Sequence, residues 1–216
     1  MRRTLGRALG ALLALFCLPA LVLLPLRWVD PPTTSYMLQS PTQPLRHAWV
    51  EPSRLGPWLP LAAVASEDQK FPRHPGFDLE AIEEALADGA GRGASTISQQ
   101  TAKNLFLWPG GWLRKGIEAW ITLWLEWLWP KGRILQVYLN IAEFGPGIYG
   151  AQAAARAHFG RDAASLSRHQ AARLVAVLPA PRSWPVHGSY ADERARWIEG
   201  QMRQLGRGYI ADIWPP

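Results

Sequence analysis

Apolar residues recur at intervals of three and four along most of the chain after residue 60, which is the spacing of helices with one buried face. Glycine and proline divide this pattern into separate segments. Apart from short pieces near residues 27–60, no segment shows the sustained alternation of apolar and polar residues that a half-buried strand requires. We therefore predict a mostly α-helical domain, with helices over residues 79–87, 96–106, 113–129, 133–142, 150–159, 167–178 and 190–205.

Two of these helices carry further local signals. The helix over 79–87 should bury Ile82 and Leu86, which lie four residues apart and so on one face. Thr96, followed three residues later by Gln99, matches a capping box for the next helix. The glycine-rich stretch between the two helices predicts a flexible gap.

The helix over 113–129 is the most regular in the chain. Five of its apolar side chains fall within about 40° of one line at about 100° per residue, and such a stripe usually packs in a core. The chain has 12 tryptophans, more than one small core requires, so we expect some of them at a membrane interface. The stripe consists of Leu113, Ile117, Trp120, Trp124 and Trp127.

The N-terminal part of the sequence is typical of a membrane anchor. Residues 8–26 contain no charged side chain, and a helix of that length would rise roughly 28 Å, close to the thickness of a bilayer core. Arginines precede it, so the positive-inside rule places residues 1–7 in the cytoplasm and everything after Arg27 on the outer side of the membrane. A cleaved signal peptide is the alternative, but no small-x-small cleavage site follows the apolar run. We expect a retained transmembrane helix.

The charge of the remaining chain excludes an obvious nucleic-acid footprint. The formal net charge is +6, but four of the 23 basic residues lie in the first 27 positions, which leaves 19 basic against 17 acidic residues. The chain has a single cysteine, which lies within the apolar run. Because there is only one, no disulfide can form within one chain. We expect a proline-rich linker over residues 27–60, a folded domain over 61–205 and a C-terminal tail over 206–216.

Glu67 is the first candidate for chemistry. It precedes Asp68 at the end of a short apolar segment, residues 61–66, and Phe71 and His74 follow closely. A surface carboxylate would explain Glu67 taken alone about equally well, but its apolar neighbours suggest partial enclosure, where a charge needs a reason. A partly desolvated carboxylate is a competent general base, worth typically ~10²–10⁴ in rate. His74 by itself is better explained as a structural hydrogen-bond partner.

A second group of polar residues follows on the next two helices. Gln100 and Lys103 are i, i+3 neighbours and can contact one ligand together. Arg114 and Glu118 have the spacing of an ordinary helical ion pair, which stabilises by ~0.2–0.5 kcal/mol. Taken with Glu67 and the expected anchor, these residues indicate an enzyme that acts on an anionic, membrane-borne substrate.

Four long runs carry a more specific signal. They are SEDQKFPRHPGFD (66–78), GASTISQQTAKNLFLW (93–108), RKGIEA (114–119) and KGRILQVYLNIAEFGPGIYGAQAAARAHFG (131–160). In order, spacing and residue choice they resemble the motifs of glycosyltransferase family 51, over about residues 45–205. The resemblance implies a lysozyme-like helical glycosyltransferase domain with a smaller, membrane-proximal jaw lobe. It favours the monofunctional members over the bifunctional penicillin-binding proteins, because no transpeptidase domain is seen.

The resemblance also implies a reaction, the polymerisation of lipid II into β-1,4-linked glycan strands with inversion at the bacterial inner membrane. Glu67 matches the base that takes the proton from the acceptor 4-hydroxyl, and Glu118 matches a second family carboxylate. Lys103 and Arg114 match residues that hold the donor pyrophosphate. Mg²⁺ or another divalent cation could lie near Glu118, and no organic cofactor is expected. The residues matched to substrate binding are Asp68, Phe71, His74, Ser95, Gln100, Lys103, Arg114 and Lys131.

Two other functions compete with this one. A lysozyme-like lytic transglycosylase would cut the same polymer, but it needs one dominant acid and has no use for cations at a pyrophosphate. A membrane-tethered scaffold with a dead site is the non-enzymatic alternative, and the presence of both carboxylates argues against it. The expected partners are lipid II, the growing glycan strand, membrane lipid and cell-division or elongation proteins, and not nucleic acid.

Overall fold

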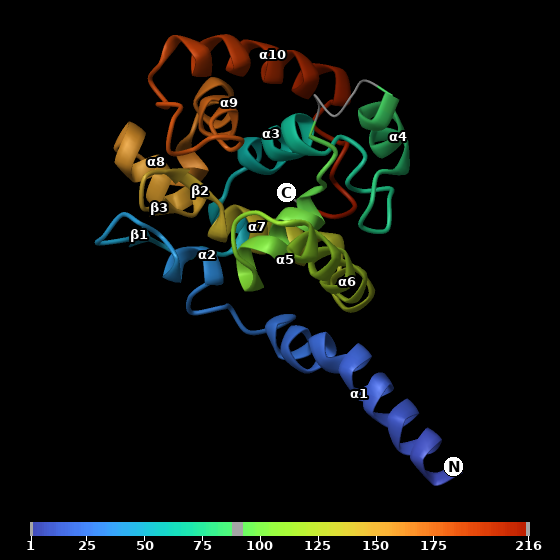
Figure 1. The fold of residues 1–216 in the computed structure, drawn as a ribbon. Coiled ribbons are helices and arrows are strands. Elements are labelled where there is room, and N and C mark those ends of the chain that lie inside the picture. The colour runs from blue at the N-terminus through green and yellow to red at the C-terminus, as the bar shows by residue number, and fades with distance from the viewer. Residues whose placement is uncertain (1, 88–92, 215–216) are drawn as a thin grey trace.

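The computed structural model describes residues 2–87 and 93–214, with the side chains of residues 2–6, 8–9 and 11–12 left aside. The described chain is mostly helical, as predicted (Figure 1). The predicted gap over residues 88–93 lies outside the described residues except for Gly93. The α-helices are α1 (Arg2–Leu26), α2 (Ser35–Leu38), α3 (Trp58–Glu67), α4 (Leu79–Ala87), α5 (Ile97–Phe106), α6 (Trp112–Leu128), α7 (Lys131–Ile141), α8 (Ala151–Phe159), α9 (Arg168–Ala176) and α10 (Ser189–Leu205), and the 3₁₀ turns are η1 (Pro52–Arg54) and η2 (Ala163–Ser165).

A small sheet joins the N-terminal segment to the middle of the chain. Its strands are β1 (Arg46–His47), β2 (Glu143–Gly145) and β3 (Ile148–Tyr149), in the order β1-β3-β2. β2 and β3 pair antiparallel, whereas β1 pairs parallel to β3. The strands are too short for an alternating pattern to be visible in the sequence.

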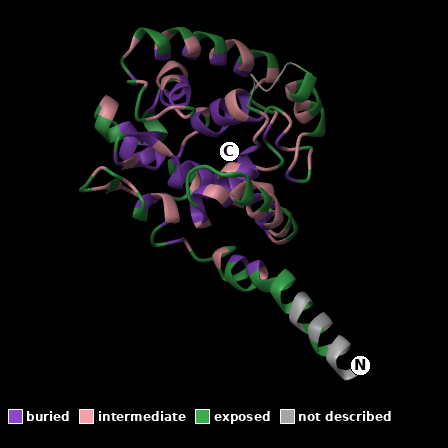
Figure 2. Ribbon diagram, in the orientation of Figure 1, coloured by how far each residue is buried: buried purple, intermediate pink, exposed green. Residues whose placement is uncertain are grey.

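The core lies between the helices of the domain, where Figure 2 shows most of the buried residues. α9 packs against both α3 and α10, and α5 packs against α6 and α7. α3 is buried along nearly its whole length, from Leu59 to Ala65, because its alanines allow neighbouring helices to approach closely. A helix enclosed in this way is a rigid support for the residue at its end.

The structure confirms the capping box of Thr96 and Gln99 at the start of α5. It also places α4 over the predicted residues, but the predicted buried face is wrong for Leu86, whose side chain is 75% exposed. No residue of α4 is buried. The helix lies at the margin of the domain, beside the residues that the structure leaves undescribed (Figure 1).

The apolar stripe of α6 is not part of the core along its whole length. Leu113 and Trp127 are 58% and 75% exposed, whereas the buried positions include Glu118 and Leu125. Trp120 and Trp124 lie toward α1. Trp120 Nε1 donates to the carbonyl of Phe16 at 3.2 Å, and the ring centres of Trp124 and Phe16 are 5.5 Å apart. The stripe thus forms the face of α6 that contacts α1 and solvent. The opposite face, which carries Glu118, packs toward the interior of the domain.

The N-terminal part of α1 extends away from the domain, and residues from Phe16 onward contact α6 (Figure 1). Leu23 is fully buried, and its carbonyl accepts a hydrogen bond from Trp129 Nε1 at 2.7 Å. Within the described residues, no helix is both long and apolar enough to cross a bilayer. The predicted transmembrane segment over residues 8–26 is therefore not supported.

Both flanking segments contribute buried residues to the domain. Within residues 27–60, Met37, Val50 and Leu55 are buried. The side chain of Asn140 on α7 holds this segment, because its Oδ1 accepts from the Val50 amide at 2.9 Å and its Nδ2 donates to the Val50 carbonyl at 3.0 Å. In the C-terminal segment, Trp214 is buried in the same core.

Candidate active site

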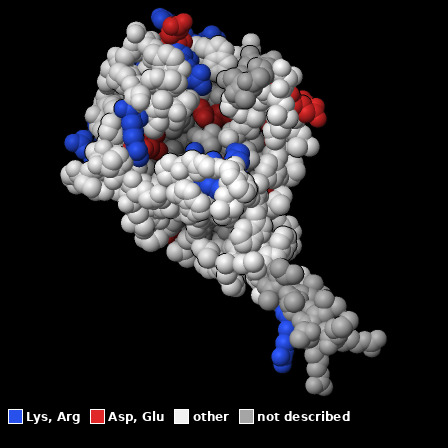
Figure 3. Space-filling model, in the orientation of Figure 1, with Lys and Arg blue, Asp and Glu red and all other residues white. Residues whose placement is uncertain are grey.

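Glu67 is the last residue of α3, so the buried helix fixes the start of its side chain. Figure 3 shows a hollow on one face of the domain, in which acidic and basic side chains come together. Its Oε2 accepts a hydrogen bond from Gln100 Nε2 at 3.1 Å, and its Oε1 accepts one from Ser66 Oγ at 3.2 Å. Burial raises the pKa of Glu67, and the hydrogen bond from Gln100 partly opposes that rise. The side chain is half-buried, which suits a base that must reach a substrate.

Asp68, the next residue, has a different environment. It is buried, and its Oδ2 accepts from the Ile97 amide at 2.9 Å while its Oδ1 accepts from His74 Nε2 at 2.8 Å. His74 Nδ1 accepts in turn from the Gly76 amide at 3.1 Å, so the neutral tautomer with the proton on Nε2 fits both contacts. Asp68 and His74, which we predicted to bind substrate, join the end of α3 to the start of α5.

α5 carries Gln100 and Lys103, two residues predicted to bind substrate, and both line one cavity. Gln100 lies between Glu67 and Tyr138, whose hydroxyl donates to Gln100 Oε1 at 3.1 Å. Lys103 lies one turn further along, 5.4 Å from the ring centre of Tyr36. In the described part of the chain, no carboxylate lies within 4.0 Å of Lys103 Nζ. Burial lowers the pKa of Lys103, and the charge of Glu118 opposes that fall.

α6 brings a compact charge cluster to the same place. Glu118 is 2% exposed, and its two oxygens pair with Arg114 and Lys115. Lys115 Nζ also donates to Ser95 Oγ at 3.0 Å, which connects α6 to the segment before α5. The predicted i, i+4 pair is confirmed, but sequence reasoning missed Lys115. Its i, i+3 spacing from Glu118 was the available signal.

The environment of Glu118 bears on the divalent cation that the resemblance suggested. A carboxylate whose two oxygens are both engaged by cationic side chains has little capacity left for a metal ion. Nor do the described residues contain a group of three or more histidine, cysteine, aspartate or glutamate side chains with the geometry of a metal site. The described residues around Glu118 do not fit a resident divalent cation.

Lys131 and Phe71 lie together near Glu126, further along α6. Phe71 is fully buried, and Lys131 Nζ lies 4.4 Å from its ring centre. The same ammonium pairs with Glu126 at 2.7 Å. Burial lowers the pKa of Lys131. In this arrangement Lys131 attaches the start of α7 to α6.

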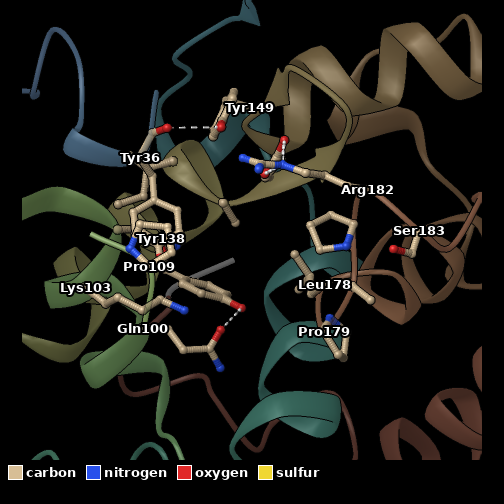
Figure 4. Close-up of a pocket in the computed structure, with 16 residues that line it drawn as sticks. Tyr36, Gln100, Lys103, Pro109, Tyr138, Tyr149, Leu178, Pro179, Arg182 and Ser183 are labelled. Atoms are coloured by element: carbon tan, nitrogen blue, oxygen red, sulfur yellow. Dashed lines mark hydrogen bonds and ion pairs between the residues drawn. The ribbon is translucent and has the colours of Figure 1, made fainter. Parts of the chain in front are cut away.

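A cavity of about 330 Å³ adjoins Gln100 and Lys103 (Figure 4). Its opposite wall carries Arg182, whose Nε lies 3.0 Å from both oxygens of Glu143. Sequence reasoning missed this pair. Its two members are 39 residues apart, so no short helical spacing links them. The cavity therefore has a cation on each side and tyrosine rings between them.

A helical domain with these features has the arrangement of an enzyme. Gln100 connects a desolvated carboxylate to the cavity that Lys103 lines, and no described carboxylate pairs closely with that ammonium. Such pKa displacements concentrate at functional sites. The family model described as Transglycosylase matches residues 34–203. The chain belongs to this family.

Curated relatives match the chain over nearly its whole length. It is 52% identical to the biosynthetic peptidoglycan transglycosylase of Pseudomonas aeruginosa, over 95% of this chain and 96% of the relative. It is 49% identical to the protein of that name from Xanthomonas campestris pv. campestris, over 97% and 92%. The protein of that name from Marinomonas sp. is 54% identical, over 89% and 88%.

Proposed function

We propose that this protein is a peptidoglycan glycosyltransferase that polymerises lipid II into β-1,4-linked glycan strands with inversion. The observation that carries the proposal is the hydrogen bond from Gln100 to Glu67, because Gln100 lines the same cavity as Lys103 and so brings the carboxylate and the ammonium together. The relatives' name, biosynthetic peptidoglycan transglycosylase, supports this substrate class.

In this mechanism Glu67 is the general base. Its carboxylate takes the proton from the 4-hydroxyl of the acceptor as that oxygen bonds to C1 of the donor sugar. The bond from C1 to the pyrophosphate oxygen breaks at the same time, so a single displacement inverts the configuration. Burial raises the pKa of Glu67, which makes its carboxylate a stronger base than an exposed glutamate.

The leaving pyrophosphate needs positive charge rather than a proton, because it is already a good leaving group. Lys103 and Arg114 are placed to stabilise the negative charge that develops on it. Glu118 does not contact substrate in this mechanism. Its two oxygens instead hold the side chains of Arg114 and Lys115 in place. No step in this mechanism requires a metal ion at Glu118.

A lytic activity is the competing proposal, because a raised pKa would also suit Glu67 as a general acid that protonates a glycosidic oxygen. The cations distinguish the two activities. A desolvated lysine in the cleft is useful for an anionic leaving group and has no role in the cleavage of an uncharged glycan bond.

We also propose that the domain works at the surface of the bacterial inner membrane, with residues 8–26 as its single-pass anchor and the N-terminus in the cytoplasm. The absence of charge from residues 8–26 supports this placement. Exposed apolar side chains on α1 and α6, such as Leu21, Trp112 and Trp127, support it further. Flotation with vesicles, for the full chain and for a variant with arginines at Leu15 and Leu21, tests it. Equal flotation of both would contradict it.

The test of the activity is a reaction of the detergent-solubilised full chain with fluorescent lipid II, in parallel with a reaction on preformed glycan. We expect long strands from lipid II and no shortening of glycan. Shortening of glycan without use of lipid II would establish the lytic activity instead. Neither reaction, from a folded protein, would favour a scaffold role.

A further inference from the structure

Tyr138 contacts Gln100, the hydrogen-bond partner of the candidate base. Tyr138 was not predicted from the sequence to be a functional residue. It belongs to α7 and is 1% exposed. Its hydroxyl donates to Gln100 Oε1 at 3.1 Å (Figure 4). Gln100 Nε2 in turn donates to Glu67 Oε2 at 3.1 Å. Three side chains from α7, α5 and α3 thus form one continuous hydrogen-bonded series that ends on the carboxylate.

The glutamine amide in this series could in principle take two orientations, because its oxygen and nitrogen ends have nearly the same shape. With the nitrogen toward Glu67 the amide donates to a carboxylate, whereas with the oxygen toward Glu67 two acceptors would face each other. The acceptor-only carboxylate of Glu67 favours the first orientation, and the Tyr138 hydroxyl supports it from the other end by donating to the amide oxygen. Burial keeps the Tyr138 hydroxyl protonated, because it holds its pKa well above the usual value.

We propose that Tyr138 is a positioning residue for the general base, which fixes the Gln100 amide so that an N–H group faces Glu67. The proposal deepens the function proposed above and rests on Glu67 as its base. Without the hydroxyl, Gln100 Oε1 would lose its buried donor. The amide would then rotate toward other partners, and Glu67 would lose a hydrogen bond that favours its charged form.

The other groups around Glu67 would remain when this hydroxyl is removed. Lys103 on α5 and Arg194 on α10 face the carboxylate, and both favour its charged form, as does the hydrogen bond from Ser66. Asp68, the neighbouring acid, raises the pKa of the Tyr138 hydroxyl, as Glu67 does. Removal of the Tyr138 hydroxyl therefore changes one contribution and should move the titration of Glu67 upward.

The chain offers a matched control in Tyr149. This residue is also fully buried and lines the same cavity, but its hydroxyl donates to the carbonyl of Tyr36 at 3.2 Å and has no connection to Glu67. Tyr138→Phe and Tyr149→Phe each delete one buried phenol hydroxyl. Only the first deletion should reach the base.

The experiment measures the rate of lipid II polymerisation against pH, and the titration of the Glu67 carboxyl by ¹³C NMR of the full chain in detergent. For Tyr138→Phe we expect the acidic limb and the Glu67 titration to move up by roughly one pH unit, with a rate about tenfold lower below that limb. At alkaline pH the rate should return to within about threefold of wild type. Tyr149→Phe should leave the Glu67 titration in place, because its hydroxyl bonds to Tyr36 and not to Gln100.

A second arm separates positioning from packing. In a Gln100→Ala background, Tyr138→Phe should produce no further shift of the Glu67 titration, because the link between them is gone. If Tyr138→Phe does not fold, 3-fluorotyrosine at 138 replaces it; as a stronger donor it should move the titration in the opposite direction. The proposal is overturned if Tyr138→Phe and Tyr149→Phe give equal shifts, or if the shift persists without Gln100. The NMR titration gives this answer even if lipid II is not the substrate.

Discussion

Replacement of Glu67 by glutamine should abolish the activity and at the same time stabilise the fold. The amide has the same shape as the carboxylate, and its contacts can be kept. Its oxygen can accept from Gln100 Nε2, and its nitrogen can donate to Ser66 Oγ. The substitution thus removes a desolvated charge without leaving a buried partner unpaired.

The magnitudes follow from the two roles of the charge. Loss of a general base should lower the polymerisation rate by ~10²–10⁴. Relief of the buried charge should raise the free energy of unfolding by about 1 kcal/mol at neutral pH, in the range of other stabilising changes at functional sites. For a chain of this size that corresponds to roughly 2–4 °C in Tm.

The pH dependence provides the sign of the effect. Because the folded-state pKa of Glu67 lies above its usual value of 4.5, its neutral form is favoured in the fold. Wild type therefore loses stability relative to Glu67→Gln as the pH rises from about 4.5 through the raised pKa. The advantage of the variant should be small at pH 4 and largest at pH 8.

Thermal unfolding at several pH values, alongside polymerisation assays, measures both effects. Glu84→Gln, which alters an exposed carboxylate on α4, is the control and should leave both quantities unchanged. A Glu67→Gln protein that is less stable than wild type at pH 8 would refute the desolvation argument. One that retains most of the activity would refute the role of the base.

Three further substitutions or treatments test the surroundings of the base. Lys103→Met should lower the polymerisation rate by ~10²–10³ and leave a protein at least as stable as wild type at pH 7, because burial lowers the pKa of that lysine; pyrophosphate should raise the Tm of wild type but not of the variant. Asp68→Asn should lower the free energy of unfolding by ~1–3 kcal/mol, since one of its two buried donors would face an amide nitrogen; equal urea midpoints would contradict this. Chelation by EDTA should leave polymerisation within twofold of the untreated rate, because both oxygens of Glu118 are engaged by cations; a loss that Mg²⁺ restores would contradict it.

Local signals predicted much of the fold. The capping box at Thr96 and the ends of α4 and α10 were visible in the sequence, because caps and periodic apolar residues act over a few positions. The buried face of α4 was not, since periodicity shows which face is apolar and not whether another element covers it. Leu86 on α4 and Trp127 on α6 are exposed for that reason.

The candidate site was predictable where family motifs marked it and less so elsewhere. Gln100 and Lys103 line one cavity, and Gln100 donates a hydrogen bond to Glu67, so the structure brings these three motif residues close together. The contributions of Tyr138 and Arg182 depend on contacts between residues 38 or more positions apart, which no local pattern reveals. Periodicity also could not show that the charged face of α6, rather than its tryptophan stripe, would turn toward the interior.

The two displaced pKa values point to the same chemical direction. Burial disfavours the charge on Glu67 and the charge on Lys103. In the proposed transfer, Glu67 receives a proton and becomes neutral, while the pyrophosphate gains negative charge that compensates the ammonium of Lys103. Both desolvation costs are therefore relieved as the bond to C1 forms, and the site is complementary to the charge distribution late in the reaction rather than to that of its empty state.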